Sequence, residues 1–278
     1  MKKINRRSFL AAAGLTAAAL ALTACGGSAS STASSTASSA ASSEAASTSA
    51  AAELTTVEAG KLTMATNAAF PPYEMTTDAG EFEGIDIDTA KAIAEKLGLE
   101  LQIDDMDFDA ALLSVQQGKA DIVMAGVTVT DERKAVMDFS DSYATGIQSI
   151  IVPEGSDITS PDDLAGKKIG TQRGTTGYIY CSDDFGDDAV VAYDDAVTAV
   201  QALNNGQVDA VVIDNAPAKE FVAANPGLVI LDTSYAEEDY AIGLAKGSAL
   251  EDAVNAALEE LKADGTLQSI VDKYITAE

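Results

Sequence analysis

Two related stretches decide the fold: residues 113–124 read LSVQQGKADIVM, and residues 201–212 read QALNNGQVDAVV. In each copy an amphipathic segment ends at a glycine, Gly118 or Gly206, and three residues later an aspartate leads into an apolar run. A glycine at this point is typical of a helix C-terminus, and a short apolar run after it indicates a buried strand. Because both copies keep the same spacing, they predict two similar α/β lobes.

Each copy is preceded by a similar opening strand, GKLTMAT at residues 60–66 and GKKIGT at residues 166–171. Apolar residues recur with helical spacing elsewhere, for example along residues 90–97 up to Gly98. Strands that alternate with helices favour parallel sheets, whose ligands bind beyond the carboxyl ends of the strands. The residues expected at those ends are Asn67, Gly126, Gln172 and Asp214.

The stretch ADIVMAGVTVTDER, which ends at Arg133, predicts a buried strand, a polar loop and a helix capped by Thr130. Backbone N–H groups at the helix start, the hydroxyls of Thr128 and Thr130 and the guanidinium form a suitable site for a carboxylate. The alternative is that Arg133 only pairs with Asp131 or Asp138 on the helix surface.

Charge and composition exclude several functional classes. The formal net charge is −27, which repels nucleic acid and anionic lipid. The chain has no histidine, so it lacks the commonest general base. Neither metal-ligand spacings nor a phosphate-binding glycine loop occur, and we expect no metal or cofactor.

The N-terminal residues have the composition of an export signal. A basic start is followed by an apolar run at residues 9–22, too short to span a bilayer, and then by LTAC ending at Cys25. This motif resembles a lipobox, so residues 1–25 are expected to form a lipoprotein signal peptide with lipid on Cys25. The sequence NRRSFL also resembles a twin-arginine signal, which leaves the export route open. Residues 26–53, nearly all Ser, Ala and Thr, are expected to form a disordered tether. Cys181 is expected to be a small, partly buried side chain, with a reactive thiol as the alternative.

Several motifs together resemble one family. They are LTMATNAAFPPYE from Leu62, GIDID from Gly84, AGVTVTDER from Ala125, DFS from Asp138, RGTTG from Arg173 and ADGT from Ala263. In this order they look like the polar amino acid-binding proteins of ABC importers, which are extracellular solute-binding proteins of family 3 with the type II periplasmic binding protein fold. The resemblance runs from about Leu54 to Ile275.

This resemblance implies two α/β lobes joined by a two-segment hinge, with a ligand cleft between them. Lobe 1 is expected at residues 54–143 plus 241–278, and lobe 2 at residues 144–240. The hinge segments are expected near residues 143–148 and 233–241.

The resemblance also implies roles for individual residues. Arg133, Thr128, Gly126 and Thr176 would hold the ligand α-carboxylate, and Asp214 would accept the α-ammonium. Phe70 and Phe108 would sandwich the side chain, while Asn67 would contact its tip. Discrimination between side chains would then fall to these three residues together with Gln172 and Gly177, of which Asn67 and Gln172 offer neutral hydrogen bonds. Two alternatives remain, since Phe70 could be an ordinary core aromatic and Asp214 could cap a turn.

The function implied is that of a monomeric, lipid-anchored binding protein on the outer face of the cytoplasmic membrane, not an enzyme. It would deliver an amino acid to the permease subunits of an ABC transporter. With no acidic group expected at the side-chain end, the ligand should be polar and uncharged, or acidic if Arg173 faces the cleft. The alternatives are an exported dehydratase or lyase on the same fold and a ligand sensor for a membrane receptor.

Overall fold

The computed structural model describes residues 54–275. The predicted signal peptide (1–25), the lipidation site at Cys25 and the predicted tether (26–53) lie outside the described residues. Among the helices described, none has the length and apolarity needed to cross a membrane.

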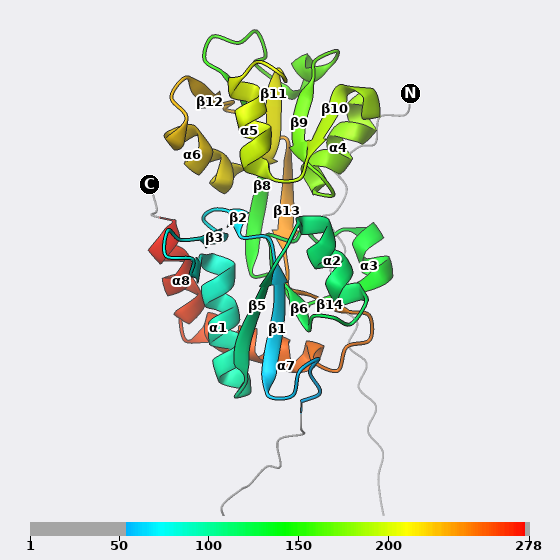
Figure 1. The fold of residues 1–278 in the computed structure, drawn as a ribbon, viewed down its shortest axis with the longest axis vertical. Coiled ribbons are helices and arrows are strands. Elements are labelled where there is room, and N and C mark those ends of the chain that lie inside the picture. The colour runs from blue at the N-terminus through cyan, green and yellow to red at the C-terminus, as the bar shows by residue number, and fades with distance from the viewer. Residues whose placement is uncertain (1–53, 276–278) are drawn as a thin grey trace, which may run out of the picture. The chain divides into compact units, whose positions relative to one another are not determined.

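The first sheet has the strand order β5-β1-β6-β14-β7 (Figure 1). Its strands are β1 (Lys61–Thr66), β5 (Glu100–Asp105), β6 (Ile122–Val123), β7 (Met137–Phe139) and β14 (Gly243–Ala245). With it occur the helices α1 (Ile85–Leu97), α2 (Phe108–Gln116), α3 (Asp131–Val136), α7 (Glu251–Ala263) and α8 (Thr266–Tyr274). A small sheet consists of β2 (Ala69–Phe70), β3 (Glu74–Thr76) and β4 (Phe82–Glu83). We call this set of elements lobe 1.

The second sheet has the order β10-β9-β11-β8-β12, and β13 also pairs with β8. Its strands are β8 (Ala144–Pro153), β9 (Ile169–Gln172), β10 (Val190–Tyr193), β11 (Ala210–Asp214), β12 (Leu228–Ile230) and β13 (Ala236–Tyr240). The helices are α4 (Thr176–Phe185), α5 (Ala196–Asn204) and α6 (Asn215–Ala224), with short 3₁₀ turns η1 (Pro161–Leu164) and η2 (Asp187–Ala189). We call this set lobe 2.

The direction of each strand depends on the type of connection that precedes it. The neighbours β5, β1 and β6 are parallel, as are β10, β9 and β11, in agreement with the predicted alternation of strands and helices. The sheets are mixed, however, because β14 is antiparallel to β6 and β7, and β8 is antiparallel to β11, β12 and β13. Both β8 and β14 enter from the other lobe through a short link instead of a crossover helix, so they run in the opposite direction.

Two connections join the lobes, one from β7 to β8 and the other from β13 to β14. The strands β8 and β13 lie side by side where the lobes meet (Figure 1). Their antiparallel register pairs Ala144 with Tyr240 and Gly146 with Glu238. These strands therefore bring residues of the connections next to the ends of both sheets.

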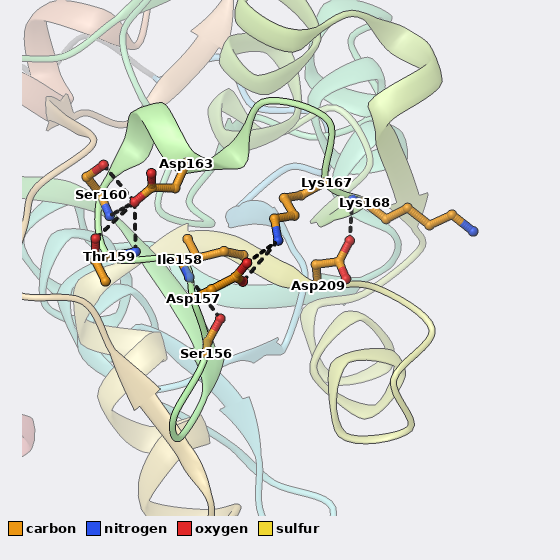
Figure 2. Close-up of polar contacts among 9 residues, drawn as sticks. All are labelled: Ser156, Asp157, Ile158, Thr159, Ser160, Asp163, Lys167, Lys168 and Asp209. Carbon is orange, nitrogen blue, oxygen red and sulfur yellow. Dashed lines mark hydrogen bonds and ion pairs between the residues drawn. The ribbon is translucent and has the colours of Figure 1, made fainter.

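The repeated stretches make the same contact in both lobes. In lobe 1 the Asp121 carboxylate accepts from the backbone N–H of Thr63 at 2.8 Å. In lobe 2 the Asp209 carboxylate accepts from the backbone N–H of Lys168 at 2.7 Å, as Figure 2 shows. In return, the backbone N–H of each aspartate donates to the carbonyl of the same partner. The glycine before each aspartate has φ of +66° or +68°, a left-handed conformation that ends the helix. Each repeat thus fastens a helix–strand turn to the opening strand of its lobe.

The loop after β8 is held by side chains that lie near this turn (Figure 2). The Asp163 carboxylate accepts from the backbone N–H groups of Thr159 and Ser160, both at 3.0 Å. Lys167 pairs with Asp157 at 2.9 Å. The mutual hydrogen bonds of Ser160 and Asp163 form a capping box at the start of η1.

The helices follow the predicted apolar patterns. Helix α1 ends at Gly98, which has φ of +69°, and α7 buries Val254, Leu258 and Leu261. A left-handed Gly265 separates α7 from α8. In lobe 2, Cys181 is fully buried among apolar side chains, more deeply than the expected partial burial.

Candidate functional site

One cavity collects all nine site residues expected from the sequence, where the carboxyl ends of β1, β6, β9 and β11 meet. Its lining consists of Asn67, Phe70, Glu74, Phe108, Ala125, Gly126, Thr128, Arg133, Gln172, Thr175, Thr176 and Asp214. The side chains leave about 20 Å³ inside, little more than one water molecule needs. A larger molecule can therefore enter only if the lobes first move apart.

Arg133 lies on the lobe 1 side of this cavity. Its backbone N–H donates to the Thr130 hydroxyl at 3.2 Å, so Thr130 caps α3 as predicted. The guanidinium donates through Nη1 to the Thr128 carbonyl at 2.7 Å and through Nη2 to the Gly174 carbonyl at 3.1 Å. It also lies 5.3 Å from the centre of the Phe108 ring. These contacts fix the fork of the guanidinium at the boundary between the lobes.

The alternative of a surface ion pair does not hold for Arg133. The side chain is only 8% exposed, and within residues 54–275 no carboxylate pairs with it. Asp138 instead pairs with Lys246 at 2.6 Å. Burial lowers the pKa of Arg133, and the negative charge of Glu238 opposes this effect. The result is a buried cation with N–H groups still available.

Asp214 lies on the lobe 2 side, at the end of β11. Its Oδ2 accepts from Gln148 Nε2 at 2.7 Å. Burial, with a smaller contribution from the charge of Glu238, raises the pKa of Asp214 to about 7. Asp214 immediately precedes α6 but makes no side-chain capping hydrogen bond to it, so the turn-cap alternative is not what the structure shows.

The other end of the cavity is polar and spans both lobes. Gln172 Nε2 donates to Asn67 Oδ1 at 2.9 Å and to the Asp194 carbonyl at 3.2 Å. Asn67 Nδ2 donates to the Met106 carbonyl at 2.9 Å. The rings of Phe70 and Phe108 are nearly buried beside these amides. This end therefore combines two amides with flat apolar walls.

Arg173 lies outside the cavity. It is half exposed, approaches Asp194 at 3.5 Å, and lines a separate hollow with Asp107 and Asp109. Arg173 therefore does not add a second positive charge to the cleft.

Glu74 is a cavity residue that the sequence analysis missed. It is fully buried, and burial raises its pKa well above the usual range, helped by the nearby charge of Asp86. Asp86, in the first turn of α1, accepts from the Gly126 N–H at 3.0 Å and from the Tyr143 hydroxyl at 2.8 Å. Burial raises its pKa to about 6. Asp86 therefore supports the loop that carries Gly126.

Glu238 was missed as well, although it lies beside the cavity. The stretch AEEDY of β13 has the composition of an exposed loop, yet its side chains alternate, with Glu238 and Tyr240 buried and Glu237 and Asp239 exposed. Alternation with period two was the available signal, but acidic residues on the buried face concealed it.

Among the described residues no cluster of three or more potential metal ligands occurs.

Comparison with known proteins gives a family and several relatives. A model of the bacterial extracellular solute-binding proteins, family 3, matches residues 62–277. The chain is 32% identical to a probable histidine-binding protein of Neisseria gonorrhoeae, over 99% of this chain and 98% of the relative.

Two solved structures are similar over the described residues. The arginine-, lysine-, histidine-binding protein ArtJ of Geobacillus stearothermophilus is 35% identical with a TM-score of 0.75, covering 78% of this chain and 96% of ArtJ. An ancestral arginine-binding protein bound to glutamine is 43% identical with a TM-score of 0.75, covering 78% of this chain and 99% of that protein.

Proposed function

The chain belongs to the bacterial extracellular solute-binding proteins, family 3, and from this we propose that it binds a polar L-amino acid outside the cytoplasm for an ABC importer. The relatives named above are binding proteins, which supports binding rather than catalysis.

The observation that carries this proposal is the placement of Arg133 and Asp214. One is a buried cation from lobe 1, the other a buried carboxyl from lobe 2, and both line one cavity. An α-amino acid carries an anion and a cation at its α-carbon, so it can contact both lobes at once. Ligand binding then favours the arrangement in which the lobes meet.

The side chain of the ligand is proposed to be one that donates hydrogen bonds. The sequence argument for an uncharged side chain counted no acidic group at the side-chain end and did not consider Glu74, which lines the cavity. Arg173, the cation that would favour an acidic ligand, lies outside it. The names of the relatives, which include arginine binding and a complex with glutamine, agree with this chemistry. We therefore propose L-arginine or L-glutamine as ligand and disfavour L-glutamate.

Calorimetry with these three amino acids tests the proposal. At a hundredfold excess over its dissociation constant, a true ligand should also add roughly 2.7 kcal/mol to the free energy of unfolding. Binding of L-glutamate in preference to the other two would contradict the side-chain argument. If none of the common amino acids binds, the transport function itself is wrong.

We also propose that lipid on Cys25 anchors the exported protein to the membrane. Replacing Cys25 with Ala should move the protein from the membrane fraction to the soluble exported fraction. A variant that stays with the membrane would show that another feature anchors it.

A further inference from the structure

Glu238 is a buried charge that the proposed ligand contacts do not use. Its side chain is 6% exposed, and its Oε2 atom accepts three hydrogen bonds. The donors are Thr128 Oγ1 at 3.1 Å, Thr176 Oγ1 at 3.0 Å and Gln148 Nε2 at 3.0 Å. Thr128 belongs to lobe 1, Thr176 begins α4 of lobe 2, and Gln148 lies on β8. One carboxylate oxygen on β13 thus accepts hydrogen bonds from side chains of both lobes.

The direction of these hydrogen bonds follows from the number of protons that the carboxylate and the hydroxyls can donate. An ionised carboxylate only accepts hydrogen bonds, and a threonine hydroxyl has a single proton to donate. When both hydroxyls donate to Glu238, they offer only lone pairs to the cavity. A ligand carboxylate, which also only accepts, gains nothing from them, whereas an ammonium group has three protons to donate.

The surroundings of the two hydroxyls agree with an ammonium site. Gln148 Nε2, which donates to Glu238, also donates to Asp214 Oδ2 at 2.7 Å. The Thr176 hydroxyl lies 3.5 Å from the same amide nitrogen and 3.4 Å from the Thr128 hydroxyl. Oxygen atoms of Asp214, Thr176 and Thr128 are thus linked through this amide and Glu238. The donors for a carboxylate lie with Arg133. Its hydrogen bonds to the Thr128 and Gly174 carbonyls use one N–H of Nη1 and one of Nη2, out of five in the guanidinium.

We propose that Glu238 is a positioning residue of the ligand cleft, which turns the hydroxyls of Thr128 and Thr176 to accept from the ligand α-ammonium. The α-carboxylate is then held by Arg133 and backbone N–H groups. This inference rests on the proposed function and changes the role that the family resemblance assigned to the Thr128 hydroxyl. Because the two hydroxyls come from different lobes, the ammonium site is complete only when the lobes meet.

The first test compares three variants by calorimetry with L-arginine and L-glutamine. Glu238→Leu should weaken binding roughly 10- to 100-fold, because it removes the acceptor that orients both hydroxyls. Glu238→Gln should recover most of this loss, since its amide oxygen still accepts. Glu237→Gln, on the exposed face of the same strand, is the matched control and should bind normally. If Glu238→Gln binds as weakly as Glu238→Leu, or if Glu238→Leu binds normally, the inference is wrong.

The second test asks whether Glu238 acts through the threonine hydroxyls. Thr176→Val alone should weaken binding, and adding it to Glu238→Gln or Glu238→Leu should cost less than the sum of the two separate losses. Melting temperatures without ligand should show the same lack of additivity. Additive losses in both measurements would overturn the inference, and the Glu238→Gln pair keeps this test open if the leucine variant does not fold.

The third test addresses the ammonium directly. 5-Guanidinopentanoate is arginine without its α-amino group, and Glu238→Leu should weaken its binding less than that of L-arginine. Equal losses would overturn the ammonium assignment. Failure of the wild type to bind either amino acid, with melting shifts that are still not additive, would instead refute the proposed function and leave the contact intact.

Discussion

At the scale of single residues, Arg133 is the strongest candidate for ligand recognition. Replacing it with Ala should raise the dissociation constant at least about 100-fold, because a buried charge-assisted contact is lost, and Lys should not restore the two-pronged grip. Calorimetry measures the loss. Arg173→Ala is the matched control, since that arginine is half exposed and outside the cavity. Equal effects of the two alanine variants would argue against the proposed site.

Asp214 should make stability depend on pH. In the folded chain its pKa is about 7, whereas an unfolded aspartate has a pKa of about 4. Between these values the folded state holds a proton that the unfolded state has lost, so the free energy of unfolding falls as the pH rises. Three pKa units correspond to about 4 kcal/mol, so Asp214→Asn should reduce this fall between pH 4 and 8 by on the order of 4 kcal/mol.

Urea unfolding without ligand measures this effect. The pKa values of Asp86 and Glu74 are raised as well, so the variant keeps their part of the pH dependence. The difference between wild type and Asp214→Asn reports Asp214 together with its effect on the pKa of Glu74. An unchanged pH dependence in the variant would show that Asp214 is not protonated near neutrality.

At the scale of elements, the strand β8 needs a glycine at position 146. A Cβ atom there would lie 2.6 Å from both Asp214 Oδ1 and the Tyr240 ring. We expect Gly146→Ala to lower the free energy of unfolding by about 1–3 kcal/mol and to weaken ligand binding, because Asp214 must move. Ile147→Ala, at an exposed neighbouring position, serves as control in denaturation and calorimetry. Normal affinity in Gly146→Ala would mean that the cavity tolerates this displacement.

The helix–strand units could be predicted from the sequence, whereas the buried acidic residues could not. The glycine and aspartate of each repeat have local meaning, a helix end and a turn, and so the helix–strand units followed from neighbouring residues alone. Glu74 and Glu238 could not be placed in this way. Their burial depends on contacts with residues more than ten positions away, such as Thr128 with Glu238. The antiparallel entry of β14 likewise depends on a link between lobes that no local pattern encodes.

At the scale of the whole molecule, ligand binding should change the distance between the lobes. The contact between Asn67 and Gln172 and that between Arg133 and Gly174 close the cavity, which has no room for an amino acid to pass. We expect small-angle X-ray scattering to show compaction on addition of the ligand identified by calorimetry. Arg133→Ala should not compact under the same conditions. A wild type that binds tightly without compaction would contradict a hinge motion.

Lobe 2 is inserted into the sequence of lobe 1, and this affects how the chain folds. All six strands of lobe 2 come from one uninterrupted stretch, whereas β14 lies between β6 and β7 of lobe 1 although it is made about one hundred residues later. Lobe 2 can therefore pair its strands within one continuous stretch, whereas the first sheet needs an interior strand that returns only after the whole of lobe 2. We therefore expect lobe 2 to become protected from hydrogen exchange earlier, and the ligand cleft to form only when the last quarter of the chain has arrived.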